Sequence, residues 1–125
     1  MGLTQHEIQI RVRYSETDAM GFLHHSHYLS YFEMGRTELF RAGGGNYRQM
    51  EESGLFFVVA RLSVQYKSPA RYDDLLTLRT SIVRPGPVKL EHEYELFRDG
   101  QLLARGQSVL ACIDRDWNVQ RIPEL

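Results

Sequence analysis

Only one long segment of this chain has apolar residues at helical spacing, and that feature most restricts the fold. Within His27–Ala42, apolar and long side chains recur at intervals of three and four residues, so one face of a helix could be buried. The run Gly43-Gly44-Gly45 that follows ends this helix. A shorter helix is expected over Tyr47–Glu52, ended by Gly54.

The remaining periodic segments alternate between apolar and polar residues, which is the pattern of half-buried strands. In the first, residues 7–14, the apolar face ends with Val12 and Tyr14. Pro85-Gly86-Pro87 predicts a turn, and Asp99-Gly100 is a strong signal for a two-residue hairpin. The strands expected after the helices cover 60–66, 76–82, 88–96 and 101–113.

The order of these segments predicts an α+β domain. A strand is followed by a long helix and then by four strands in a meander, so those four are expected to be mainly antiparallel. One helix can cover only one face of such a sheet. We therefore expect a single domain over residues 1–125, with a sheet edge and apolar surface that a partner subunit could cover.

Composition excludes several classes of function. The 125 residues are 42% hydrophobic and 25% charged, and the formal net charge is −1, so no global field favours nucleic acid or an anionic membrane. Cys112 is the single cysteine, so no intrachain disulfide can form and a reducing compartment is expected. Without a signal-peptide pattern or a long apolar stretch, the sequence predicts a cytoplasmic protein with no membrane span.

The densest group of functional side chains lies between Tyr14 and Glu38, at the junction of the first strand and the long helix. Such junctions gather unpaired amides of the helix N-terminus, which favour negative charge nearby. A carboxylate such as Asp18 could attack a carbonyl carbon or activate water there, while the amides stabilise the oxyanion.

These residues also have simpler interpretations. Asp18 could cap a turn or the following helix. The histidines at 24, 25 and 27 could face solvent or lie satisfied in the core, and their spacing matches no recognised zinc motif. No G-x-S-x-G motif surrounds Ser26, so a serine nucleophile is not indicated there. Cys112 lies in the middle of a predicted strand and is expected to be a buried core residue and not a nucleophile. Local sequence reasoning alone stops at a suggestive cluster.

The same residues resemble the signature of the 4-hydroxybenzoyl-CoA thioesterase family, in particular its tol-pal-associated acyl-CoA thioesterase branch. This family has the hotdog fold, in which one long central helix is wrapped by a five-stranded, mainly antiparallel sheet. The resemblance covers nearly the whole chain. It is carried by the motif Arg13-Tyr14-Ser15-Glu16-Thr17-Asp18-Ala19-Met20-Gly21, by His25, Tyr28, Tyr31, Glu33 and Arg36-Thr37-Glu38, and by Phe57-Val58-Val59, Val64, Tyr66, Pro69-Ala70-Arg71 and Asp73-Asp74.

The resemblance implies roles for three residues near the start of the helix. Asp18 matches the catalytic aspartate, acting as nucleophile or general base. His25 falls where this branch has a histidine, and the backbone N–H around it would polarise the thioester carbonyl. Tyr14 matches a tyrosine that could orient the aspartate or the acyl group. The implied enzyme is an acyl-CoA thioesterase that uses no cofactor and no metal.

The resemblance also implies an active site formed between two subunits of a homodimer or a dimer of dimers, up to a homotetramer. Val58 and Val59 of one chain would line the acyl pocket that faces Asp18 of the other. The phosphates of coenzyme A are expected to meet basic side chains at the mouth of the site. The candidates for this contact are Arg61, Lys67, Arg71, Arg84 and Lys89, each of which could equally be a solvated charge on a strand.

Other functions remain open at this point. The His-Phe-Pro-Gly pattern of hotdog dehydratases is absent, and so is the hydratase pattern of Asp and His around a proline. A non-catalytic module that binds acyl-CoA or acyl-carrier protein would be indicated by loss of the acid at Asp18, but the acid is present. An acyl-carrier-protein thioesterase is a further alternative.

Overall fold

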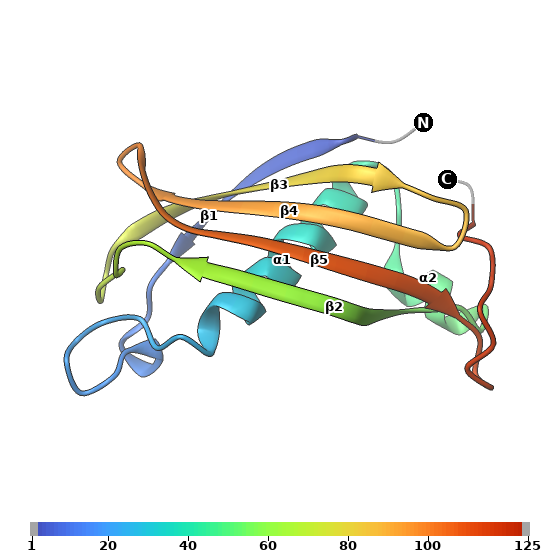
Figure 1. Ribbon diagram of the computed structural model, residues 1–125, viewed down its shortest axis with the longest axis horizontal. Coiled ribbons are helices and arrows are strands. Elements are labelled where there is room, and N and C mark those ends of the chain that lie inside the picture. Colours follow the sequence, from blue (N-terminus) through green and yellow to red (C-terminus); the bar gives the residue numbers. More distant parts are fainter. Residues whose placement is uncertain (1–2, 124–125) are drawn as a thin grey trace.

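A long helix, α1 (His27–Ala42), crosses one face of an antiparallel sheet (Figure 1). The computed structural model describes residues 3–123, apart from the side chain of Arg84. Within this range the sheet has five strands in the order β1-β3-β4-β5-β2. The elements besides α1 are β1 (Gln5–Arg11), η1 (Tyr14–Glu16), α2 (Tyr47–Glu52), β2 (Phe56–Tyr66), β3 (Leu75–Pro85), β4 (Lys89–Arg98) and β5 (Gln101–Ile113).

The architecture confirms the predicted α+β class and both predicted helices. All four strand pairings are antiparallel. Asp99 and Gly100 both have positive φ angles, 49° and 82°, which is the backbone that a two-residue hairpin between β4 and β5 requires. No helix within the described part of the chain is long and apolar enough to cross a membrane.

The predicted meander of four strands is wrong at its first step. β2 pairs with β5, and β3 pairs with β1 and β4, so only β3, β4 and β5 form a meander. The segment between β2 and β3 carries the chain from one edge of the sheet toward the other. It is fixed on the way, because the Lys67 N–H donates to the Leu103 carbonyl at 2.8 Å and the Leu23 N–H donates to the Ala70 carbonyl at 2.8 Å.

The first strand is shorter than predicted, and this changes the position of Tyr14. β1 ends at Arg11, and the chain then leaves the sheet through backbone hydrogen bonds between Val12 and residues 73 and 74. Val12 is fully buried as expected, but Tyr14 lies in the short helix η1 and is 78% exposed. The alternation of side chains therefore did not extend to Tyr14, because the backbone turns before it.

Two glycines allow α1 to approach the sheet closely. A Cβ atom at Gly106 on β5 would overlap the ring of Phe32, which is fully buried and stacks on Tyr94 with ring centroids 4.5 Å apart. A Cβ atom at Gly35 would overlap the side chains of Thr80 and Leu78 on β3. The absence of side chains at these positions lets the helix face pack directly onto the strands.

β2 is an edge strand, paired with β5 on one side only (Figure 1). It is 11 residues long, and its register with β5 shifts between Val59 and Arg61, where Ala60 is the extra residue. On its other side, the backbone N–H and C=O groups of β2 face no strand within residues 3–123. Such an edge can pair with another chain.

Candidate functional site

The loop that carries Asp18 is anchored to α1 by a buried carboxylate. Glu16 is 4% exposed, and its Oε1 accepts hydrogen bonds from the Arg13 backbone N–H at 2.8 Å and from the Tyr31 hydroxyl at 2.7 Å. Its Oε2 accepts from the Arg13 guanidinium at 3.1 Å. The backbone carbonyl of Glu16 also accepts from the His24 N–H at 2.9 Å. Glu16 thus connects both ends of the loop to the first turns of the helix.

These hydrogen bonds keep Glu16 ionised despite its burial. Burial on its own raises the pKa of a carboxyl group, because it disfavours the charged form. The hydrogen bonds from Arg13 and Tyr31 outweigh burial, so the pKa of Glu16 lies below its ordinary value. The same arrangement raises the pKa of Tyr31, through its own burial and the adjacent carboxylate. At neutral pH the pair is a phenol that donates to a carboxylate.

Asp18 lies in a tight turn between Thr17 and Leu23, which form an isolated antiparallel bridge. One of its oxygens, Oδ1, accepts hydrogen bonds from the backbone N–H groups of Met20 at 2.9 Å and Phe22 at 3.2 Å. The alternative that Asp18 caps a turn is therefore confirmed for this oxygen. Its other oxygen, Oδ2, makes no hydrogen bond within residues 3–123, and the side chain is half-buried.

Tyr66, the last residue of β2, holds the segment that precedes α1. Its hydroxyl donates a hydrogen bond to the backbone carbonyl of His25 at 3.1 Å. Its ring packs edge-on against the buried ring of Tyr28, with centroids 4.9 Å apart. Burial raises the pKa of Tyr28, so this hydroxyl stays protonated at neutral pH. The end of the edge strand therefore positions the backbone at His25.

The Asp18 cavity, as we call it, is an open hollow of about 310 Å³ beside these residues. It brings together three of the residues predicted from sequence, namely Asp18, His25 and Lys67. The backbone N–H of His25 has no acceptor in the part of the chain that the structure describes. The full lining is Asp18, Phe22, Leu23, His25, Tyr28, Tyr66, Lys67, Ser68 and Pro69.

His24 and His25, just before α1, lie ring against ring. The rings of His24 and His25 lie 4.1 Å apart, and Nδ1 of His24 accepts a hydrogen bond from the Ser26 backbone N–H at 3.2 Å. The same Nδ1 lies 2.9 Å from the Ser26 hydroxyl oxygen. No group of three or more metal-binding side chains occurs among residues 3–123.

Two other predicted residues, Tyr14 and Arg71, do not line this cavity. The ring of Tyr14 packs edge-on against Tyr72, with centroids 5.4 Å apart, and does not line the cavity. The guanidinium of Arg71 lies 5.2 Å from the ring centre of Phe22, which does line it. Arg71 is exposed, so its guanidinium remains accessible to a phosphate group.

The remaining predicted residues lie toward the other end of the sheet. Val58 and Val59 occupy the start of β2, whereas the Asp18 cavity lies at its end. At a rise of about 3.3 Å per residue, Val58 and Tyr66 are about 26 Å apart along the strand. Lys89 lies two strands away from Val58 at the same level of the sheet, because both pair with Ala111 of the intervening β5. The side chain of Arg84 lies outside the part of the chain that the structure describes.

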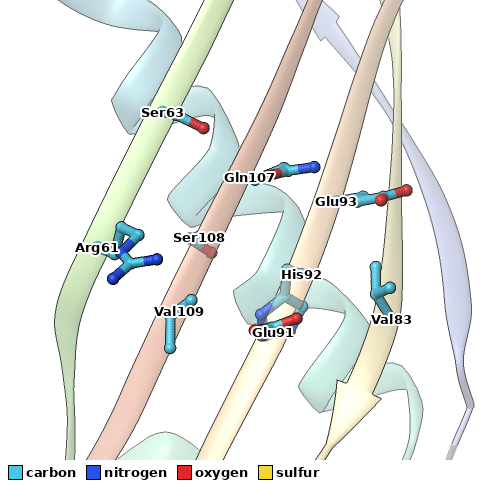
Figure 2. A pocket seen from close by; sticks show the side chains of 9 residues that line it. All are labelled: Arg61, Ser63, Val83, Glu91, His92, Glu93, Gln107, Ser108 and Val109. Carbon is cyan, nitrogen blue, oxygen red and sulfur yellow. The ribbon is translucent and has the colours of Figure 1, made fainter.

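Arg61 borders a second hollow, of about 300 Å³, on the face of the sheet opposite α1. Figure 2 views the sheet from this face, with α1 behind the strands. Arg61 lies here with Ser63 of its own strand and with Gln107 and Glu93 of β5 and β4. Within one chain, the sheet therefore separates Arg61 from the Asp18 cavity on the helix side.

Sequence reasoning missed the structural importance of Glu16 and Tyr66. Both were part of the motif, but no local pattern indicates that Glu16 is buried or that Tyr66 reaches the His25 carbonyl from 41 positions further along the chain. The sequence pointed only indirectly to Glu16, through its place in the dense run of functional side chains before the helix. Only the folded chain reveals which partners they contact.

Comparison with known proteins places this geometry in a family. A family model described as the thioesterase-like superfamily matches residues 12–125. The chain belongs to this superfamily. The match confirms, at the level of the family, the expectation of a thioester hydrolase, while membership of the narrower 4-hydroxybenzoyl-CoA thioesterase family is not established by it.

Individual named proteins resemble the chain over most of its length. The acyl-CoA thioesterase YbgC of Haemophilus influenzae is 36% identical over 108 residues, which are 84% of this chain and 78% of that protein. The acyl-CoA thioester hydrolase YbgC of Escherichia coli O6:H1 is 30% identical over 115 residues, covering 91% and 86% of the two chains.

A solved structure extends the likeness to three dimensions. The DHNA-CoA thioesterase of Staphylococcus aureus superposes with a TM-score of 0.89 at 30% identity. The match covers 96% of this chain and 80% of that one. Together with the antiparallel sheet and the long helix across it, this confirms the predicted hotdog fold.

Proposed function

We propose that this protein hydrolyses the thioester of an acyl-coenzyme A to a free acid and coenzyme A, with Asp18 as nucleophile or general base. The observation that carries the proposal is the hydrogen bonding of the two oxygens of the Asp18 carboxylate. Two backbone amides hold Oδ1, while Oδ2 is unpaired within residues 3–123, beside a cavity that also contains His25. A fixed carboxylate with one free oxygen is suited to acyl transfer.

Two reaction routes are compatible with this carboxylate. As a nucleophile, Asp18 attacks the thioester carbon, the C–S bond breaks, and an anhydride forms that water then hydrolyses. As a general base, it removes a proton from water as the water oxygen attacks, and collapse of the tetrahedral intermediate releases the thiolate. In both routes the carbonyl oxygen gains negative charge, and the free N–H of His25 is the donor proposed to stabilise it.

The proposed active site is shared between two subunits of a homodimer. If the free edges of two β2 strands pair antiparallel about their midpoints, the start of one strand meets the end of the other. Val58 and Val59 of one subunit then approach the Asp18 cavity of its partner and line the acyl pocket. Two such dimers could assemble further into a homotetramer.

Basic residues from both subunits are proposed to contact the phosphates of coenzyme A. Lys67 lines the Asp18 cavity and Arg71 lies beside it. Arg61 and Lys89 remain candidates from their places at the middle of β2 and at the start of β4. Arg84 remains a candidate from its place in β3. Tyr14, which packs on Tyr72, is proposed to shape the mouth of the site.

Acyl-coenzyme A thioesters are the proposed substrates, by resemblance to the named relatives, and the cytoplasm is the proposed compartment. The named relatives act on acyl-CoA or DHNA-CoA thioesters. An aryl group, as in the 4-hydroxybenzoyl-CoA thioesterase family, and short or long aliphatic chains are the classes to compare. Pocket volume decides among them, and one or two side chains can set it.

Release of free thiol from a panel of acyl-CoAs tests the proposed reaction. The panel spans acetyl-, octanoyl-, palmitoyl- and 4-hydroxybenzoyl-CoA, and octanoyl-acyl-carrier protein is included to test the alternative carrier. Enzyme-dependent thiol release from at least one acyl-CoA is expected. Binding of an acyl-CoA without any thiol release would instead support a non-catalytic binding module, and cleavage of the acyl-carrier-protein thioester alone would identify the other carrier.

A further inference from the structure

A cavity of about 210 Å³ lies at the C-terminal end of α1, on the side of the sheet that the helix covers. We call it the distal cavity. Its wall is mostly apolar, and the polar residues that contribute to it are Arg36, His92, Thr4 and Tyr47. Its apolar wall includes Leu39 and Phe40 of α1, Phe57 of β2 and Leu90 of β4.

Arg36 is a nearly buried cation with weak partners. Its side chain is only 11% exposed, yet its two polar contacts are long. One guanidinium nitrogen lies 3.5 Å from the Tyr94 hydroxyl, and the other lies 3.7 Å from a carboxylate oxygen of Glu33, whose side chain is 71% exposed. The guanidinium has five N–H donors, and among the described residues its polar contacts are those with Tyr94 and Glu33. A buried charge of this kind favours an anionic partner.

His92 is a second polar group at the distal cavity, and one of its ring nitrogens lacks a hydrogen-bond partner within the described residues. It is 3% exposed, and its Nδ1 makes no hydrogen bond within the described residues. Burial and the positive charge of Arg36 lower the pKa of His92 to about 4, so the ring is neutral at pH 7. A neutral imidazole can donate one hydrogen bond without adding charge. The two residues together can receive an oxygen atom at the end of an apolar ligand.

The position of the distal cavity relates it to a second subunit. Within one chain, α1 separates it from Asp18, because a helix of 16 residues is about 24 Å long. Phe57, near the start of β2, lines the distal cavity, and Tyr66, at the end of β2, lines the Asp18 cavity. Antiparallel pairing of two β2 strands brings these unlike ends together. The distal cavity of one subunit then adjoins the Asp18 cavity of its partner.

We propose that the distal cavity receives the far end of the acyl group, and that Arg36 and His92 select acyl groups that end in a carboxylate. This inference rests on the proposed function, because it places the thioester at Asp18 of the partner subunit. The apolar wall contacts the methylene chain or ring of the acyl group. The guanidinium of Arg36 binds the terminal carboxylate, and His92 donates to one of its oxygens.

Matched pairs of acyl-CoAs test this selectivity. Adipoyl-CoA ends in a carboxylate, and 6-methylheptanoyl-CoA has the same shape with an isopropyl group in place of that carboxylate. Glutaryl-CoA and suberoyl-CoA, each with its branched counterpart, vary the length of the acyl group. The measured quantity is the ratio of kcat/KM within each pair. In Arg36→Met, the kcat/KM of the carboxylate substrate divided by that of its branched counterpart is expected to fall at least about tenfold for the best-fitting length. This fall corresponds to the loss of one charge-assisted contact.

Two further variants keep the test decisive. Arg41→Met removes an exposed arginine of the same helix, which pairs with Glu38, and should leave the ratio unchanged. If Arg36→Met does not fold, Arg36→Lys, which keeps the charge but loses the planar fork, should lower the ratio as well. An unchanged ratio in a folded Arg36 variant, or an equal change in Arg41→Met, overturns the proposal.

A binding measurement separates this inference from the proposed reaction. If the wild-type protein releases thiol from no acyl-CoA, the proposed function fails. Calorimetric titration with hexanoate, an apolar chain with a carboxylate, then tests the distal cavity by itself. Binding that weakens at least about tenfold in Arg36→Met supports the assignment, and no binding or equal binding contradicts it. Hydrolysis of both members of a pair with an unchanged ratio contradicts only the selectivity.

Discussion

The hydroxyl of Tyr31 on α1 donates a 2.7 Å hydrogen bond to Oε1 of Glu16 in the loop that carries Asp18. Both side chains are buried, with 1% and 4% of their surfaces exposed. This contact joins the loop that carries Asp18 to the helix that crosses the sheet. The position of the Asp18 turn therefore depends on core packing as well as on its own hydrogen bonds.

Tyr31→Phe should lower both stability and activity. The change leaves the buried Glu16 carboxylate without one of its donors, so the free energy of unfolding is expected to fall by about 1.5–3 kcal/mol. The loop should also lose order, which lowers kcat/KM. Chemical denaturation and thiol release measure the two effects. Tyr72→Phe, which alters an exposed ring, is the control, and a folded Tyr31→Phe with wild-type stability would contradict the anchoring role of Glu16.

Tyr66→Phe should affect activity more than stability. The phenol donates to the His25 carbonyl at the surface, so its loss is expected to cost only about 0.5–1.5 kcal/mol of folding free energy. The backbone around His25, which holds the proposed oxyanion donor, should however become less well positioned. We expect kcat to fall severalfold with little change in thermal midpoint. A variant with unchanged kcat would show that the contact is not needed for catalysis.

Acidification should destabilise the protein through His92. Its pKa is lowered from 6.5 to about 4 by burial and by Arg36, so the unfolded chain binds more protons than the folded one between these values. The stability contributed by neutral His92 is thus complete above about pH 6.5 and is lost as pH falls toward 4, by about 3 kcal/mol in total.

Denaturation midpoints measured from pH 7 to pH 4 test this dependence. Glu16, whose pKa is lowered, adds a loss of stability at the acidic end, because protonation removes its ionic contacts. The contribution of His92 is therefore taken as the difference between wild type and His92→Gln. That difference should shrink as the pH falls, whereas His6→Gln should follow the wild-type profile. A difference independent of pH would contradict the assignment.

Gly106→Ala should destabilise the core without touching the site. The new methyl group would overlap the ring of Phe32 and force the helix away from β5, which is expected to cost about 1–3 kcal/mol. The neighbouring change Gln107→Ala lies on the opposite face of the sheet and should stay within about 0.5 kcal/mol of wild type. Equal stability of the two variants would mean that the helix can shift freely.

Much of this fold was predictable because its elements depend on local patterns. The triple glycine ended α1 where expected, and the Asp99-Gly100 pair formed its hairpin. The pairing of β2 with β5 was not predictable, since it depends on a crossing segment that is held by distant backbone contacts. Tyr14 was placed wrongly in a strand for a related reason, because alternation continued in sequence after the backbone had turned.

The candidate site was only partly accessible from sequence. The run around Asp18 located the carboxylate, and the structure places it beside His25 and Lys67 in one cavity. The distances that matter most, from Tyr31 to Glu16 and from Tyr66 to His25, join segments that have no local signal. The grouping of Arg36 with His92 likewise needs the register of α1 on β4.

The most direct test of the central claim is the rate of thiol release by Asp18→Asn, measured with the best acyl-CoA of the panel. The amide keeps an oxygen for the Met20 and Phe22 N–H groups, so the turn should persist, but it cannot act as nucleophile or base. We predict that kcat falls at least about a hundredfold with folding intact, while Asp116→Asn retains wild-type activity. A folded Asp18→Asn enzyme with wild-type kcat would contradict the catalytic assignment.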